Sequence, residues 1–242
     1  PRGGVSERLM KIGLLKCDFV MPEFHGIDGG IPDMFTHLIG QTGLGAKLKI
    51  YRVWEGELPA TTDECDAWFT SGARASVFED LDWIKNFQQF IVALHADRRK
   101  TVGICFGHQM IAQALGGEVR RSERGWGIGV QEVAIAAPEP WMQPPLTGVR
   151  MLFTHQDQVE QLPPGARLLG STGHCPHAMF ALDSHILAMQ SHPEYSRRYL
   201  RALIESREAI IEPLTFQTGL ASLEQPPHRE EPAAWLRLFL LA

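Results

Sequence analysis

The sequence lacks several features that would define its class. No apolar run approaches the roughly 20 residues that span a bilayer, and the first ten residues, PRGGVSERLM, have no apolar stretch of a signal peptide. Cysteine is scarce: the four cysteines, at positions 17, 65, 105 and 175, lie far apart and form no CxxC pair. That spacing argues against a disulfide framework and a zinc ribbon. We therefore expect a cytoplasmic protein in a reducing compartment, with no membrane partner.

Basic clusters and cofactor motifs are equally sparse. The net charge is −5, and the densest basic run, RRSER at 120–124, is interrupted by Glu123, so we expect no nucleic-acid partner. No G-x-G-x-x-G precedes a helix, which makes a flavodoxin-like cofactor binder a weak hypothesis. The motif GHCPH at 173–177 offers histidine and cysteine, but zinc needs three or four converging ligands. We predict neither a metal nor a cofactor.

What is present is a strand–helix alternation over the first half of the chain. With 242 residues and 44% apolar content, the chain suits one α/β domain. Short apolar strands are expected at 10–19, 47–54, 66–72 and 101–106, with helices between them, which predicts a parallel sheet covered on both faces. After residue 117, successive short strands at 130–136, 150–156, 166–172, 178–184 and 185–193 predict a hairpin-rich antiparallel portion. The expected fold is α/β, with a mostly parallel, flavodoxin-like central sheet flanked by helices and an added antiparallel portion in the C-terminal half.

Helix boundaries can be predicted at a few places. Ser76 and Glu79 form an S-x-x-E pattern that predicts the start of a helix. A last helix is expected to start near Ser196 and to end at Pro213. We expect a single domain over 1–242, with a leader at 1–9 and a C-terminal extension from about 213. Within that extension, residues 235–241 are expected to dock as a short apolar helix.

The stretch GICFGHQ, at 103–109, places a cysteine between a strand and a helix. Gly103 and Gly107 flank Cys105 and permit a sharp turn, as in the nucleophile elbow of serine hydrolases. The positive end of the following helix favours the thiolate. The alternative for Cys105 is that it packs as a small buried hydrophobe.

A base for such a thiol is available near the end of the last strand. In QSHPE, His192 and Glu194 are two residues apart, so in extended backbone their side chains point to the same side. Together with Cys105 they predict a Cys–His–Glu constellation. For a developing oxyanion, one backbone N–H would be that of Phe106, and a second could come from the turn at Gly72, where glycine permits close approach of a ligand.

Three motifs together resemble a known family. GICFGHQ, THQDQVEQLPPGA (from residue 154) and QSHPE are similar to class I, triad-type glutamine amidotransferase domains, most of all that of GMP synthase and its free-standing relatives. The similarity extends from about residue 10 to about 203. It implies that Cys105 attacks the side-chain amide carbon of glutamine to form a γ-glutamyl thioester, that His192 transfers the protons, and that Glu194 orients His192. It further implies an oxyanion and substrate-binding set formed by Gly72, Ala73, Phe106, Gln109, Thr154, His155, Gln156 and Asp157.

The chain departs from that family's pattern at several points. Ala73-Arg74 stands where relatives often have Gly-Pro, and Gln156 stands where they commonly have glycine, so a substrate other than free glutamine is possible. The SGGxDS-type phosphate loop of GMP synthase is missing, so ammonia would pass to a separate synthetase chain or to water. The leading hypothesis is a glutaminase-type thiol amidase, and a stand-alone γ-glutamyl peptidase is the alternative within that class. A non-catalytic regulatory module or thiol sensor with the same fold is the alternative of another class.

Overall fold

The structure is a computed structural model that describes residues 9–242, so the leader expected at 1–9 lies, except for Leu9, outside the described residues. The strands are β1 Met10–Lys16, β2 Ala46–Arg52, β3 Ala67–Thr70, β4 Lys100–Ile104, β5 Glu118–Arg121, β6 Gly127–Ile135, β7 Gly148–His155, β8 Asp157–Gln161, β9 Ala166–Ser171, β10 Met179–Leu182 and β11 Ile186–Met189. The α-helices are α1 His25–Asp28, α2 Ile31–Thr42, α3 Asp82–Ala96, α4 Phe106–Ala114, α5 Arg197–Glu205, α6 Pro213–Ser222 and α7 Glu230–Leu241. Short 3₁₀ turns lie at Pro22–Phe24, Val53–Glu55 and Glu208–Ile210.

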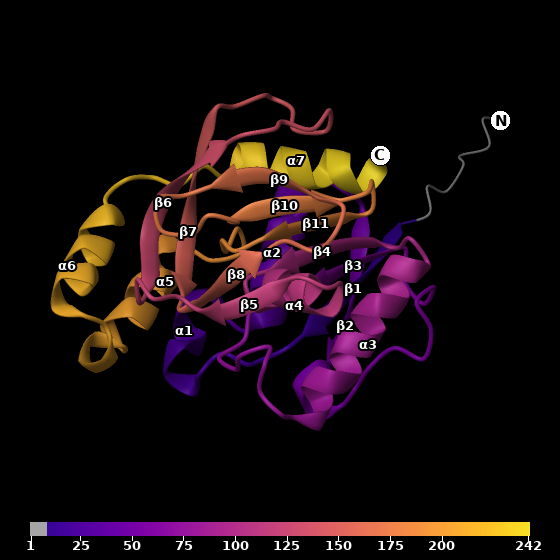
Figure 1. The fold of residues 1–242 in the computed structure, drawn as a ribbon, viewed down its shortest axis with the longest axis horizontal. Helices are drawn as coiled ribbons and strands as arrows, with labels where there is room; N and C mark the ends of the chain where they lie inside the picture. The colour runs from indigo at the N-terminus through magenta and orange to yellow at the C-terminus, as the bar shows by residue number, and fades with distance from the viewer. Residues whose placement is uncertain (1–8) are drawn as a thin grey trace.

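A nine-stranded sheet forms the centre of the molecule, in the order β2-β1-β3-β4-β11-β10-β9-β6-β7 (Figure 1). Five neighbouring strands run parallel to one another, namely β2, β1, β3, β4 and β11. β10, β9, β6 and β7 continue the sheet through antiparallel pairs. This confirms the predicted α/β fold with an antiparallel portion. One strand belongs to both parts of the sheet: β11 pairs antiparallel with β10, as expected for the antiparallel portion, and parallel with β4, with Met189 opposite Ile104. The segments that follow β4 and β11 therefore emerge side by side at one edge of the sheet.

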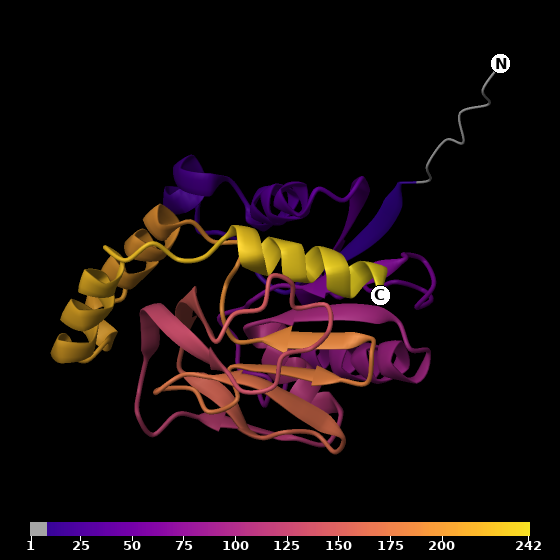
Figure 2. The ribbon, with the colours of Figure 1, turned by 90° about the horizontal axis from the view of Figure 1, so that it is seen from above.

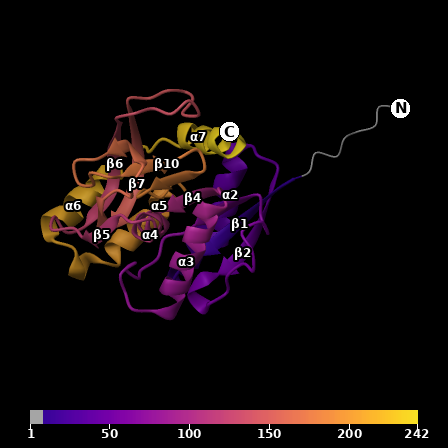
Figure 3. The ribbon, with the colours of Figure 1, turned by 45° about the vertical axis from the view of Figure 1, so that its right-hand side comes forward.

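Successive residues of a strand point to opposite faces of the sheet, and both faces of the parallel strands carry apolar side chains. Helices therefore cover both faces. Leu14 and Phe69 pack with α2 and α7 in one core cluster, whereas Leu15 and Trp68 pack with α3 and α4 in another. Figure 2 shows α7 running beside α2, and Figure 3 brings α3 and α4 to the front of the sheet. α6 stands at the edge of the molecule next to β6 (Figure 1).

Two of the predicted helix boundaries are wrong, for physical reasons that the structure makes clear. Glu79 does accept a hydrogen bond from the Ser76 N–H at 2.7 Å, but the Ser76 hydroxyl donates to Asp157 and α3 begins only at Asp82. Ser196 caps α5 as predicted, yet α5 ends at Glu205. Pro213 instead begins α6, where its fixed φ suits a first helical turn.

One pair of strands was not predicted from the sequence. β5 and β8 form a separate two-stranded antiparallel sheet. Their sequences, EVRR and DQVEQ, are mostly polar and bury one apolar residue each near the centre, Val119 and Val159, so no apolar alternation marks them.

The C-terminal segment is held by helix packing. The expected apolar helix at 235–241 lies within α7, which buries Trp235, Leu236, Phe239 and Leu240 against α2 and the sheet. The division of the chain into one domain with an extension from about residue 213 stays a prediction.

None of the helices formed by residues 9–242 combines the length and apolar character needed to cross a membrane.

The junction between β4 and α4 depends on two glycines. A Cβ at Gly103 would lie 2.9 Å from the backbone carbonyl of Gly107, and a Cβ at Gly107 would overlap the side chain of Thr70 on the neighbouring strand. Thr70 is fully buried and cannot turn outward. The two glycines therefore let α4 leave the sheet in direct contact with the backbone of β3 and β4.

We expect Gly107→Ala to lower the free energy of unfolding by about 3 kcal/mol or more, because the added methyl group overpacks a site with no free volume. Denaturant unfolding followed by circular dichroism measures the change. Gly173→Ala is the matched control, since a Cβ there meets no atom within 4 Å. Equal midpoints for the two variants would contradict the packing described for this junction.

Candidate active site

Cys105 occupies the turn between β4 and α4 in a conformation that is rare for a residue with a side chain. Its φ is 51°. Two hydrogen bonds hold it there: its N–H donates to the Met189 carbonyl at 2.9 Å, and its own carbonyl accepts the first helical bond from the Gln109 N–H at 3.0 Å. α4 begins at Phe106, so the positive end of its dipole lies against the Cys105 side chain. The sulfur is thus presented at the carboxyl edge of the parallel sheet, as in an elbow.

His192 and Glu194 follow β11 at the same edge. His192 Nδ1 lies 2.7 Å from Glu194 Oε1, and both side chains are almost fully buried. The His192 ring stacks on Tyr195 with centroids 4.0 Å apart and planes 6° apart, and its backbone N–H donates to the Leu152 carbonyl. The imidazole therefore has one fixed orientation. Tyr195 was not expected from the sequence, because its position against His192 depends on the turn that follows β11.

Gly72 lies between the cysteine and the histidine. A Cβ built on Gly72 would sit 2.9 Å from His192 Cε1 and 3.8 Å from Cys105 Sγ, so both side chains border the same point of the β3 turn. Burial disfavours a charged imidazole, but the charges of Glu194 and Cys105 and the hydrogen bond to Glu194 outweigh it and raise the pKa of His192. The arrangement can hold a protonated imidazole beside the sulfur.

A buried glutamine is a further partner of the cysteine that the sequence analysis missed. Gln190 Nε2 donates to Cys105 Sγ at 3.4 Å, and its Oε1 accepts from Gln109 Nε2 at 3.0 Å. Gln109 Nε2 also donates to the Asp157 carbonyl at 2.6 Å. The side-chain amides thus link Cys105 to β8. Proximity to His192 in the sequence was the only available signal for Gln190.

A cavity of about 330 Å³ opens above Cys105. Of the predicted site residues, the structure brings seven to its lining: Ala73, Cys105, Gln109, Thr154, His155, Gln156 and Asp157. Gly72 and Phe106 lie beside Cys105 but do not line this cavity. The lining residues that the sequence did not predict for the site are Arg74, Ala75, Ser76, Arg121, Trp126, Arg207 and Ile210. Trp126 thus forms part of a wall of the site.

Three arginines surround this cavity. Arg74 forms a bidentate ion pair with Asp18, with nitrogen–oxygen distances of 2.9 and 2.6 Å. Arg121 Nε lies 3.4 Å from Asp157 Oδ1. Arg207 donates to the Thr154 hydroxyl at 2.6 Å and lies over the Trp126 ring. Two of the three are paired with carboxylates, so it is Arg207 whose charge favours an anionic group of a ligand.

The floor of the cavity includes an uncharged histidine. His155 is buried, and burial together with the neighbouring His174 holds its pKa well below the ordinary value. Neither of its ring nitrogens has a hydrogen-bond partner within residues 9–242. His155 therefore offers a neutral donor or acceptor near the cysteine.

The described residues contain one group with metal-ligand spacing, and it is remote from Cys105. His95, Asp183 and His185 bring ligand atoms within 4.8 Å of one another. Asp183 Oδ2 is already paired with Arg98 at 3.0 Å. Since His185 precedes β11 and Cys105 follows its parallel neighbour β4, the group lies at the opposite edge of the sheet. It has no part in the cavity above Cys105.

Comparison with known proteins agrees with this geometry. Residues 33–209 match the family described as glutamine amidotransferase class-I. Gamma-glutamyl peptidase 4 of Arabidopsis thaliana is 33% identical over 184 residues, covering 73% of this chain and 72% of that protein. One component of the glutamine-hydrolyzing GMP synthase of Sulfolobus acidocaldarius is 31% identical over 132 residues, covering 54% of this chain and 68% of that protein.

Solved structures share the fold over nearly the whole chain. A glutamine amidotransferase from Thermotoga maritima superposes with a TM-score of 0.72 and 20% identity, covering 95% of this chain and 96% of that one. A second, from Methylobacillus flagellatus, gives a TM-score of 0.71 at 20% identity, covering 95% and 93% of the two chains. Motifs, fold and family match agree, and the chain belongs to the class I glutamine amidotransferase family of enzymes.

Proposed function

We propose that this enzyme hydrolyses a γ-glutamyl amide bond through a γ-glutamyl thioester on Cys105. The observation that carries the proposal is the convergence of Cys105, which lines a cavity, and the paired His192–Glu194 on either side of Gly72. A buried imidazole that is oriented by a carboxylate and lies against a sulfur is the arrangement that thiol hydrolases need.

The reaction would proceed in two steps. In the first, Cys105 Sγ forms a bond to the amide carbon, the carbon–nitrogen bond breaks, and the leaving amine takes a proton from the His192 imidazolium. In the second, neutral His192 accepts a proton from water, the resulting hydroxide attacks the thioester carbon, and the carbon–sulfur bond breaks. Each tetrahedral oxyanion would be held by the N–H groups of Phe106 and Ala73, and residues 9–242 supply no acceptor for either N–H.

For the substrate, we favour a γ-glutamyl compound with a leaving group larger than ammonia. Gln156 lines the cavity at a position where the family commonly has glycine, and Arg74, Arg121 and Arg207 surround a space of about 330 Å³. Gamma-glutamyl peptidase 3 of Arabidopsis thaliana is a second relative of this kind, 30% identical and covering 73% of this chain. These observations favour the γ-glutamyl peptidase hypothesis over the glutaminase hypothesis.

The glutaminase hypothesis keeps one specific support. The relative from Sulfolobus acidocaldarius is part of a glutamine-hydrolyzing synthase, so ammonia could pass from Cys105 to a separate synthetase chain. All four cysteines are free thiols, which fits a reducing, cytoplasmic setting for either hypothesis.

A comparison of substrates separates the two hypotheses. With purified protein, we expect kcat/KM for γ-glutamyl dipeptides to exceed that for glutamine by at least about tenfold, measured as amino acid and ammonia release. Cys105→Ala should abolish both. Faster ammonia release from glutamine would favour the glutaminase, and turnover that survives in Cys105→Ala would refute the thioester route.

We expect Glu194→Gln to lower kcat by roughly 10²- to 10⁴-fold, since the amide neither fixes the tautomer of His192 nor stabilises the imidazolium. Glu194 raises the pKa of His192, so its loss lowers that pKa. The alkaline limb of the kcat–pH profile, where the imidazolium loses its proton, should therefore move to lower pH. A limb that stays in place would show that Glu194 does not act on His192.

We expect Gly72→Ala to lower kcat by roughly 10²-fold, because the new methyl group would press on the His192 ring, which cannot retreat past Tyr195. Gly40→Ala is the control, since a Cβ there meets no atom within 4 Å. Thermal unfolding of both variants checks the fold. Wild-type kcat in folded Gly72→Ala would contradict the close approach of the β3 turn to His192.

A further inference from the structure

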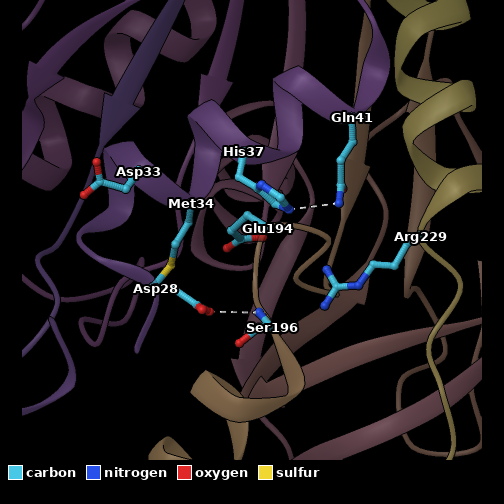
Figure 4. Close-up of a pocket in the computed structure, with 8 residues that line it drawn as sticks. All are labelled: Asp28, Asp33, Met34, His37, Gln41, Glu194, Ser196 and Arg229. Carbon is cyan, nitrogen blue, oxygen red and sulfur yellow. Dashed lines mark hydrogen bonds between the residues drawn. The ribbon is translucent and has the colours of Figure 1, made fainter. Parts of the chain in front are cut away.

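A second cavity lies behind Glu194, away from Cys105. It has a volume of about 350 Å³ and is lined by Asp28, Asp33, Met34, His37, Gln41, Glu194, Ser196 and Arg229 (Figure 4). None of these residues lines the cavity above Cys105. Glu194 thus contacts His192 on one side and borders a separate space on the other.

The carboxylate of Glu194 is only half satisfied. Oε1 pairs with His192 Nδ1, whereas Oε2 is buried and has no hydrogen-bond partner among residues 9–242. Only one side-chain hydrogen bond therefore fixes the carboxylate of Glu194. Its alignment on His192 depends on how firmly the backbone that carries it is held.

Arg229 holds the segment that carries Glu194. Its Nη1 donates to the Pro193 carbonyl at 2.9 Å, and its Nη2 donates to the Tyr195 carbonyl. The two acceptors are the residues directly before and after Glu194. The Arg229 side chain is half-buried, and the charge of Glu194 acts on its guanidinium. A planar fork is well suited to fixing two carbonyls at once.

The other ionisable groups of the second cavity are already engaged. Asp28 accepts from the Ser196 N–H at 3.3 Å, and Asp33 accepts from the Gly30 N–H at 2.7 Å. His37 Nε2 lies 3.0 Å from the side-chain amide of Gln41. Arg229 is the one arginine or lysine in the lining.

We propose that Arg229 is a positioning residue for the reaction: it clamps the backbone on both sides of Glu194 and keeps that carboxylate aligned on His192. It reaches the site from the N-terminal end of α7, beyond residues 33–209 that match the family. The C-terminal segment thereby completes the active site from behind. This inference rests on the proposed γ-glutamyl hydrolase function.

The first test compares Arg229→Ala with Arg237→Ala. Arg237 is a matched control, because it lies on α7, which follows Arg229, and also donates to two carbonyls, those of Thr42 and Gly43, neither of which lines the second cavity. We expect Arg229→Ala to lower kcat by roughly 10²-fold with KM unchanged, since Arg229 does not line the substrate cavity. Arg229→Lys should recover part of the loss. Arg237→Ala should keep wild-type kcat.

Two further measurements separate positioning from a structural role. Millimolar guanidinium, below denaturing concentrations, should enter the second cavity of Arg229→Ala and restore kcat, but should leave the wild type unchanged. In a Glu194→Gln background, Arg229→Ala should cause little additional loss, because residues that act as a unit are not additive.

The outcomes are distinct. Wild-type kcat in Arg229→Ala, or full additivity with Glu194→Gln, would overturn the inference while leaving the proposed function intact. Equal losses of kcat in Arg229→Ala and Arg237→Ala would show that Arg229 only anchors α7, and would also overturn the inference. Absence of γ-glutamyl hydrolysis by the wild-type enzyme would instead be the failure of the proposed function.

Discussion

The positive φ of Cys105 is the constraint on which the rest of the site depends. A residue with a side chain adopts this conformation at a cost of about 1–3 kcal/mol, so the surrounding structure must impose it. Gly103 and Gly107 allow α4 to start in contact with the backbone of β3 and β4, and the Met189 carbonyl holds the Cys105 N–H. Because β11 pairs in parallel with β4, the same register that fixes the cysteine also brings His192 to it.

The imidazole is held as firmly as the sulfur. Tyr195 stacks on one face of His192, Gly72 approaches its edge, and Glu194 binds Nδ1. These contacts hold the ring in one orientation, and Glu194 also raises the pKa of His192. A protonated imidazole in a fixed orientation suits proton transfer to an amine. The clamp that we infer for Arg229 extends this support to the backbone behind Glu194.

The sequence predicts those parts of the molecule whose signals are local. Apolar strands and the glycines around Cys105 indicate a parallel sheet with an elbow, and the two-residue spacing of His192 and Glu194 indicates their pairing. Features that depend on tertiary contacts could not be predicted. Ser76 misleads because its hydroxyl bonds to Asp157 rather than capping a helix, and Gln190 looks like any polar residue until the fold places it against Cys105.

The central claim is that Cys105 is the reactive thiol of a site that binds γ-glutamyl compounds. Peptide mapping by mass spectrometry after treatment with a diazoketone analogue of glutamine measures this most directly. None of the three other cysteines, Cys17, Cys65 and Cys175, lines the cavity above Cys105, so they serve as internal references. The account predicts one adduct per chain, on Cys105. An unmodified Cys105 at saturating reagent, or label on another cysteine, would contradict it and would favour a non-catalytic thiol sensor.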